Sequence, residues 1–230
     1  MTTPHGRQTK KKVTQILSDS QGTEALSLLE LIPEEQLVGP LFSHFYAMDE
    51  LIKFRSIIAM GELALRLSHK QMEKARILMR RIMWNLNDES GGIGWGSPEA
   101  MGQILYKSPA LAMEFKSILF SYLDHRGNFL EHELLQRGVL WGIGTYLKAS
   151  SRDLDDTTEG LIFAHLHSLD PVKRGYALRA LINADRFNAK AIPKHILTDS
   201  EPIDIFTGWN FVTSRICDMT CDNTVSLAIP

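Results

Sequence analysis

Apolar residues recur at intervals of three and four along most of the chain, which is the spacing of one face of an α-helix. Two consecutive stripes are clearest, formed by Leu51, Phe54, Ile57, Ile58 and Leu65, then by Met72, Ala75, Met79, Ile82, Met83 and Leu86. The pattern predicts two long helices on either side of a turn at Ser68. Further helices are predicted over about 12–18, 23–31, 33–46, 97–108, 109–124, 129–148, 157–168 and 171–184.

The second long helix has apolar residues on two sides. At about 100° per residue, Trp84 lies opposite the main stripe, beside Ile77 and one turn after Arg80. A helix in a stacked array needs two apolar faces, because it contacts both its own partner and the next repeat. The pattern therefore favours an all-α array of helix pairs.

The pattern changes after Pro193. Residues 203–206 and 209–212 alternate with a period near two around Thr207-Gly208, which predicts a small β-hairpin, and Thr224 to Ile229 could add a strand. We therefore expect a flexible basic tail over 1–12, a helical repeat domain over 13–192, and a β-containing cap of the same domain over 193–230.

Segments of the helical region repeat. Residues 54–58 (Phe-Arg-Ser-Ile-Ile) match 115–119 (Phe-Lys-Ser-Ile-Leu) at an offset of 61, and the pairs Arg76/Arg137 and Ile82/Ile143 keep that offset. A further copy opens at Asp170-Pro171 and continues with Arg174 and an Ala- and Leu-rich helix. These residues resemble HEAT-like repeats of the type found in phycobilin lyases, in which Asp-Pro-x-x-Arg opens such a helix.

The resemblance covers about residues 48–186 and implies an α-solenoid. Within it, the segment Arg-Arg-x-x-Trp-x-Leu-Asn-Asp-Glu-Ser-Gly-Gly from Arg80 is similar to an uncharacterised group of bacterial HEAT-like proteins. That likeness implies a fold and no activity. It also implies that Arg55, Arg76, Arg137 and Arg174 are salt-bridge or capping residues within repeats.

Composition narrows the classes of function. The chain of 230 residues is 44% hydrophobic and has a formal net charge of −2, with acidic and basic residues interspersed, which argues against nucleic acid as a partner. It has no apolar run of about 20 residues and no secretory signal, so we expect a cytoplasmic protein without membrane contact. We expect a monomer or weak homodimer, and read Cys217 and Cys221, four apart, as ordinary thiols.

The connection between Arg80 and Ala100 is the most unusual stretch, with two tryptophans, four glycines, three carboxylates and two arginines. No strand precedes it and no Lys-Ser/Thr ends it, so neither a dinucleotide fingerprint nor a P-loop fits. Its Ser97-Pro98-Glu99 order predicts an N-cap, a first-turn proline and a dipole-stabilising acid. The alternative to a functional loop is an ordered turn that folds Trp95 back onto the helices.

From this stretch we predict a binding surface. It comprises Arg80, Arg81, Trp84, Asn85, Asn87, Asp88, Glu89, Ser90, Gly91, Gly92, Gly94, Trp95, Gly96, Glu99 and Trp141. Asp88, Glu89 and Glu99 could perform acid and base chemistry or bind a hard cation. The simpler interpretation pairs Asp88 and Glu89 with Arg80, Arg81 or Arg126, and places Glu99 at a helix dipole.

One further group could bind metal. His125, Glu131, His132 and Glu133 offer nitrogen and oxygen ligands, and the His132-Glu133 pair resembles the iron-binding motif of HEAT-repeat deoxyhypusine hydroxylases. Those enzymes use several such pairs and this chain has one, so a solvated helix start is favoured and no metal or cofactor is predicted.

The function predicted from the sequence is that of a binding or adaptor protein, with a protein or small ligand held at Asn85–Glu99. An enzyme with a carboxylate and tryptophan pocket on the same loop is the main alternative. A HEAT-like DNA glycosylase is a third, because that fold can hold a flipped base against tryptophan and aspartate.

Overall fold

The computed structural model describes residues 4–87 and 94–220 of the chain. Within them lie eleven α-helices and one two-stranded antiparallel sheet, so the mostly helical class with a C-terminal hairpin is confirmed. The bounds are α1 Pro4–Asp19, α2 Gly22–Glu30, α3 Glu34–His44, α4 Glu50–Lys70, α5 Met72–Leu86, α6 Ser97–Lys107, α7 Pro109–Ser121, α8 Glu133–Leu147, α9 Asp156–Ala164, α10 Pro171–Asn183, α11 Lys194–Leu197, β1 Pro202–Thr207 and β2 Asn210–Arg215.

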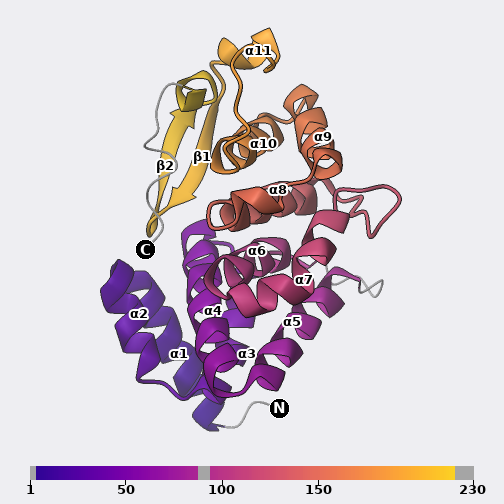
Figure 1. The fold of residues 1–230 in the computed structure, drawn as a ribbon. Coiled ribbons are helices and arrows are strands. Elements are labelled where there is room, and N and C mark those ends of the chain that lie inside the picture. The colour runs from indigo at the N-terminus through magenta and orange to yellow at the C-terminus, as the bar shows by residue number, and fades with distance from the viewer. Residues whose placement is uncertain (1–3, 88–93, 221–230) are drawn as a thin grey trace.

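Helices α4, α6, α8 and α10 lie side by side in that order and form a central row (Figure 1). Contacts between α6 and α8 advance in the same order along the two helices, because Glu99 contacts Gly138 and Gly102 contacts Gly142. The two helices therefore run in the same direction. A Cβ atom on Gly102 would lie 2.2 Å from the Cα atom of Gly142. Glycine at both positions therefore permits an approach that no other residue would allow.

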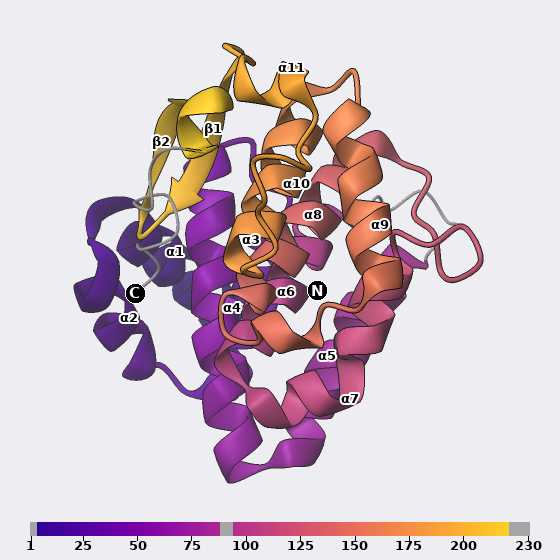
Figure 2. The same cartoon turned by 45° about the horizontal axis from the view of Figure 1, so that its top comes forward.

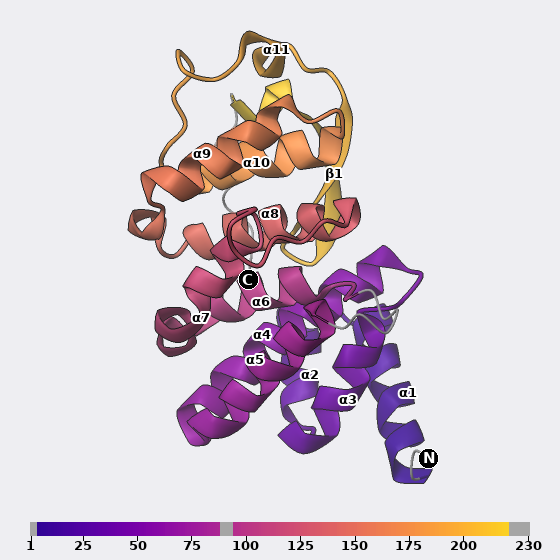
Figure 3. The ribbon, with the colours of Figure 1, turned by 90° about the vertical axis from the view of Figure 1, so that its right-hand side faces the viewer.

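The other helices flank this row. Figure 2 shows α5, α7 and α9 along one side and the hairpin along the other, while Figure 3 shows α1 to α3 at the α4 end. Ion pairs join neighbours on the α5 side, including Arg76 to Glu114 at 2.7 Å and Lys116 to Asp153 at 2.6 Å. None of the described helices is both long and apolar enough to cross a bilayer.

The hairpin packs across the central row. Its strands pair from Pro202 opposite Arg215 to Thr207 opposite Asn210. The turn is formed by Gly208, at φ +64°, and Trp209, one residue later than the predicted Thr207-Gly208. Phe206 of β1 stacks on Phe54 of α4 at 5.2 Å between ring centroids. The hydroxyl of Tyr176 on α10 donates to the backbone oxygen of Asp204 at 3.2 Å. The hairpin therefore contacts both ends of the row, α4 and α10.

A buried arginine joins the hairpin to the N-terminal helices. The Arg55 side chain, 3% exposed, donates to the backbone oxygens of Leu17 and Ser18 in the last turn of α1. It also donates to the Trp209 oxygen and the Asn210 side chain of the hairpin. The Trp209 indole donates to the Ser20 oxygen at 3.0 Å. These contacts join α1 to the hairpin, whereas the sequence placed Arg55 as a salt-bridge or capping residue within a repeat.

Several sequence-based boundaries were wrong. Helix α1 begins at Pro4, within the predicted flexible tail, because proline fits the first turn of a helix. Helix α8 begins at Glu133 rather than 129, since His132 caps it. The N-cap of α6 is Gly96 at φ +70°, not Ser97. The predicted strand at Thr224 to Ile229 lies outside the described residues.

The 61-residue offset does not match equivalent helices in space. It aligns α4 with α7 and α5 with α8, and each match pairs one helix of the central row with one that flanks it. Helices that occupy equivalent positions are α4, α6, α8 and α10. The offset therefore does not identify the helices that occupy equivalent positions in the row.

Candidate binding site

Two glycines between α5 and α6 lie too close to other residues to carry a side chain. A Cβ atom on Gly94 would lie 2.6 Å from the backbone oxygen of Asn85, and one on Gly96 would lie 3.0 Å from the Cβ atom of Phe45. Gly96 also has a positive φ, which disfavours other residues. Packing alone therefore explains both glycines. The predicted residues Asp88, Glu89, Ser90, Gly91 and Gly92 lie outside the described part of the chain.

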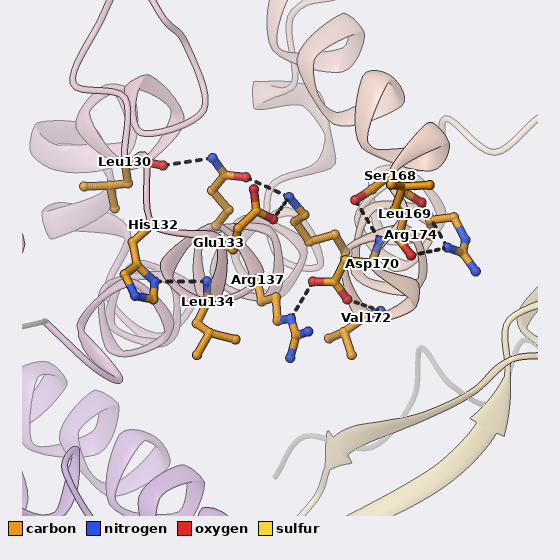
Figure 4. Close-up of polar contacts among 12 residues, drawn as sticks. Leu130, His132, Glu133, Leu134, Arg137, Ser168, Leu169, Asp170, Val172 and Arg174 are labelled. Carbon is orange, nitrogen blue, oxygen red and sulfur yellow. Dashed lines mark hydrogen bonds and ion pairs between the residues drawn. The ribbon is translucent and has the colours of Figure 1, made fainter.

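Trp95 contacts the start of α8. Its ring meets the His132 ring edge-on, with centroids 5.2 Å apart and planes at 89°. The Nδ1 atom of His132 accepts a hydrogen bond from the Leu134 backbone N–H at 3.2 Å (Figure 4). This bond assigns the proton of the neutral ring to Nε2. His132 is therefore both the N-cap of α8 and the partner of the predicted tryptophan.

The segment before α8 is fixed by buried polar contacts. The Gln136 side chain donates to the Leu130 oxygen at 3.0 Å and accepts from Lys173 of α10 at 3.0 Å. Lys173 also forms an ion pair with Glu133. Glu133 thus serves as an ion-pair partner for α10, and no group of three or more His, Cys, Asp or Glu side chains in the described residues could hold a metal ion.

An open depression of about 560 Å³ lies between the end of α5 and this segment. Its lining is formed by Leu86, Asn87, Gly127, Asn128, Phe129, Leu130, Glu131, His132 and Leu135. The carboxamides of Asn87 and Asn128 both donate and accept hydrogen bonds, while buried Leu86, Leu130 and Leu135 provide apolar surface. The Asn128 amide already donates to the Ser121 hydroxyl at 2.9 Å. A depression of this kind can bind an extended, partly polar ligand.

Only part of the predicted surface meets at the depression. Asn87 lines it, and Trp95 contacts its wall through His132. Arg80 pairs with Glu73 at 2.7 Å, and Arg81 lies over the Phe42 ring at 4.1 Å. Trp84 is 70% exposed on α5, and Asn85 supports Gly94. Arg126 pairs with Asp124 at 3.1 Å.

Glu99 and Trp141 lie inside the molecule. Glu99 is 8% exposed and Trp141 is fully buried, and neither lines the depression. Burial raises the pKa of Glu99 from 4.5 to about 7, against the opposing effect of Lys53. Glu99 does lie in the first turn of α6, where the sequence placed it at a helix dipole, but the packing of its carboxyl group against Gly138 in the interior was not predicted.

The sequence did not assign the 127–131 segment to the site. It named Glu131 only as a possible metal ligand, whereas the structure places Gly127 and Asn128 opposite Asn87. The available signal was a glycine and an asparagine next to Phe129, whose ring packs on His125 at 3.7 Å between centroids. Long-range pairing of two connections cannot be derived from either connection alone.

Comparison with known proteins adds one relative. A protein of Archaeoglobus fulgidus, described as uncharacterized, is 30% identical over 111 residues, which cover 48% of this chain and 54% of that protein. The chain thus spans about half the length of that relative. No protein-family model and no solved structure matches the chain.

Proposed function

We propose that this chain is a binding protein of the HEAT-like type, which holds an extended polypeptide segment of its partner in the depression beside Trp95 and His132. The central observation is that this depression joins the end of α5, where the unusual glycine-tryptophan connection begins, to the segment before α8. Two connections distant in sequence thereby form one continuous surface.

The order of the helices supports a HEAT-like solenoid. Parallel helices α4, α6, α8 and α10 are each preceded by a flanking helix, as expected for stacked helix pairs. A charged contact links successive helices of the row: Arg137 of α8 pairs with Asp170, the N-cap of α10, at 2.6 Å (Figure 4). Arg174 of α10 pairs with Asp199, which follows α11, at 2.7 Å. These arginines match those assigned to repeats from the sequence.

The backbone of the depression favours a polypeptide partner. Residues 129–132 are neither helix nor strand, and the N–H groups of Phe129, Glu131 and His132 bond to no described residue. An extended peptide can pair with such groups while its side chains occupy apolar positions. Asn87 and Asn128 can pair with further peptide amides.

Affinity capture tests the proposal. The full chain, the double variant Asn87→Ala/His132→Ala and the control Met113→Ala are each incubated with lysate of the organism that encodes the chain, and captured proteins are quantified. Met113 is 83% exposed on α7 and does not line the depression. We expect a partner that is depleted at least about tenfold with the double variant and retained with the control, since a lost hot spot of about 1.4 kcal/mol has that effect.

Circular dichroism must first show that all three proteins are folded. Equal capture by all three would contradict the proposed surface. If the wild type alone retained a small molecule and no protein, the depression would remain the binding site, but the proposal of a polypeptide ligand would be refuted.

The structure offers less to the enzyme and glycosylase alternatives. Among the three carboxylates on which they rest, Glu99 is the one within the described residues, and it is buried away from the depression. Trp141, a candidate for either pocket, is fully buried as well. We therefore propose binding without catalysis at this surface.

A further inference from the structure

A second cavity, of about 180 Å³, lies where α3, α4 and α5 meet. Helix α4 contacts both of the other two helices (Figure 3). The apolar part of the cavity wall is formed by Val38 of α3, Leu67 of α4, and Ile77 and Leu78 of α5. Leu67 and Leu78 are buried, whereas Ile77 is 55% exposed, so the cavity extends from the interior to the surface. None of its lining residues lines the depression beside Trp95.

The charged part of the lining carries one positive charge that is not balanced. Glu34 pairs with Lys70 at 2.6 Å, and Glu35 pairs with Lys74 at 2.8 Å. Hydrogen bonds from the two lysines lower the pKa of both carboxyl groups, so both pairs are ionised at neutral pH and cancel. Arg81 also lines the cavity, and it forms no ion pair with any described residue. The lining therefore favours an anionic group beside Arg81.

The position of the Arg81 side chain is set by an aromatic ring. Its guanidinium lies over the ring of Phe42, 4.1 Å from the centroid. Phe42 is 4% exposed, so the ring is held in place by the core. The N–H donors of a guanidinium lie in its plane, and a contact through its face leaves them available to a carboxylate. Arg81 is thus an oriented donor group beside an apolar cavity.

We propose that this cavity binds an aliphatic monocarboxylate, with its alkyl chain among the side chains of α3, α4 and α5 and its carboxylate at the Arg81 guanidinium. A volume of about 180 Å³ accommodates a chain of about six carbon atoms, at about 30 Å³ for each, the share of one molecule in liquid water. The other lining side chains are apolar or already paired, which favours a free acid over the C-terminus of a polypeptide, whose backbone amides would need partners. The site does not depend on the function proposed for the depression.

Titrations of the full chain, followed by two-dimensional amide NMR spectroscopy at pH 7, test the proposal. The probes are butanoate, pentanoate, hexanoate and octanoate, with hexanamide as the uncharged analogue of hexanoate. We expect hexanoate to shift amide signals of α3 and α5 with a Kd on the order of 1 mM or below. Affinity should rise about fourfold with each added methylene group until the cavity is filled, and then stop rising. Hexanamide should bind at least about tenfold more weakly, because it lacks the charge that pairs with Arg81.

Two neighbouring arginines provide a variant and its matched control. Arg81→Gln should weaken the binding of hexanoate at least about tenfold and leave the binding of hexanamide unchanged, since only the charge pair is lost. Arg80→Gln should bind hexanoate as the wild type does, because Arg80 pairs with Glu73 at 2.7 Å and does not line the cavity. The comparison of hexanoate with hexanamide on the wild type tests the same charge pair without depending on the fold of any variant.

Four results would each overturn the proposal. The first is that no probe shifts amide signals of α3 or α5, and the second is that hexanoate and hexanamide bind equally. The third is that Arg80→Gln and Arg81→Gln weaken hexanoate to the same extent. The fourth is that N-acetylnorleucine, which carries a butyl side chain and models the C-terminus of a polypeptide, binds more tightly than hexanoate, because the cavity would then recognise a polypeptide end rather than a free acid.

Discussion

Replacing Glu99 with glutamine should remove a pH dependence from the stability of the fold. Glu99 is buried beside Gly138, and this burial raises its pKa from 4.5 to about 7. Glutamine has nearly the same shape and cannot titrate. At low pH the wild type and Glu99→Gln should therefore have similar free energies of unfolding, since the carboxyl group is then neutral in both the folded and unfolded chain.

The size of the effect follows from the two pKa values. Between pH 4.5 and 7 the unfolded chain loses the Glu99 proton first, so the stability given by the neutral acid is lost as pH rises through the folded pKa. A rise from 4.5 to about 7, at about 1.4 kcal/mol for each tenfold change in proton affinity, corresponds to about 3 kcal/mol. Above pH 7 Glu99→Gln should thus be more stable than wild type by about this amount, offset by any difference in packing.

Urea unfolding followed by circular dichroism at 222 nm, at intervals from pH 5 to 8.5, measures this difference. Glu114→Gln is the control, because the Arg76 guanidinium lowers the pKa of Glu114, and its loss cannot stabilise the chain at high pH. The reasoning is refuted if the difference between wild type and Glu99→Gln stays constant within about 0.5 kcal/mol across the range, the uncertainty of such comparisons.

Four further substitutions test the packing. Arg55→Met should lower the free energy of unfolding by about 3 kcal/mol, because it leaves buried backbone oxygens without donors. Thermal unfolding measures this loss, and a loss smaller than about 1 kcal/mol would show that the contact is dispensable. Gly142→Ala should cost about 3 kcal/mol, because its Cβ atom would lie 2.6 Å from the Pro98 oxygen. Gly160→Ala on α9, where a Cβ atom would meet open space, should raise the free energy of unfolding by about 0.5–1 kcal/mol. Equal effects of Gly142→Ala and Gly160→Ala in urea titrations would contradict the close approach of α6 and α8. Trp84→Ala should change stability by less than about 0.5 kcal/mol in the same assay, since the side chain is 70% exposed, and a larger loss would show that the ring is packed.

The helices could be predicted because they depend on local spacing. Apolar residues at steps of three and four located the helical segments, and the helix opening at Asp170-Pro171 was placed correctly, because Asp170 accepts a bond from the first turn of α10. The N-cap of α6 was missed because Ser97 lies one residue inside the helix. Gly96 takes the left-handed conformation there, and this depends on its packing against Phe45, a contact between distant residues.

The candidate site was less predictable for the same reason. The sequence marked Trp95 and Asn87 as unusual, but their neighbour His132 was assigned to a solvated helix start. Residues that differ by about 40 in sequence meet only after α6 has packed between α4 and α8. Glu99 was grouped with Asp88 by proximity in the sequence, although the turn of α6 directs its carboxyl group toward Gly138.

Site-specific photo-cross-linking tests the proposed binding surface most directly. A benzoylphenylalanine replaces Asn128 at the depression in one protein, and Met113 on the exposed face of α7 in another. Both are irradiated with lysate of the source organism, with and without the additional change His132→Ala. We predict one discrete protein adduct from position 128 that disappears with His132→Ala and does not form from position 113. Equal adducts from both positions, or none from position 128, would contradict a partner surface beside Trp95 and His132.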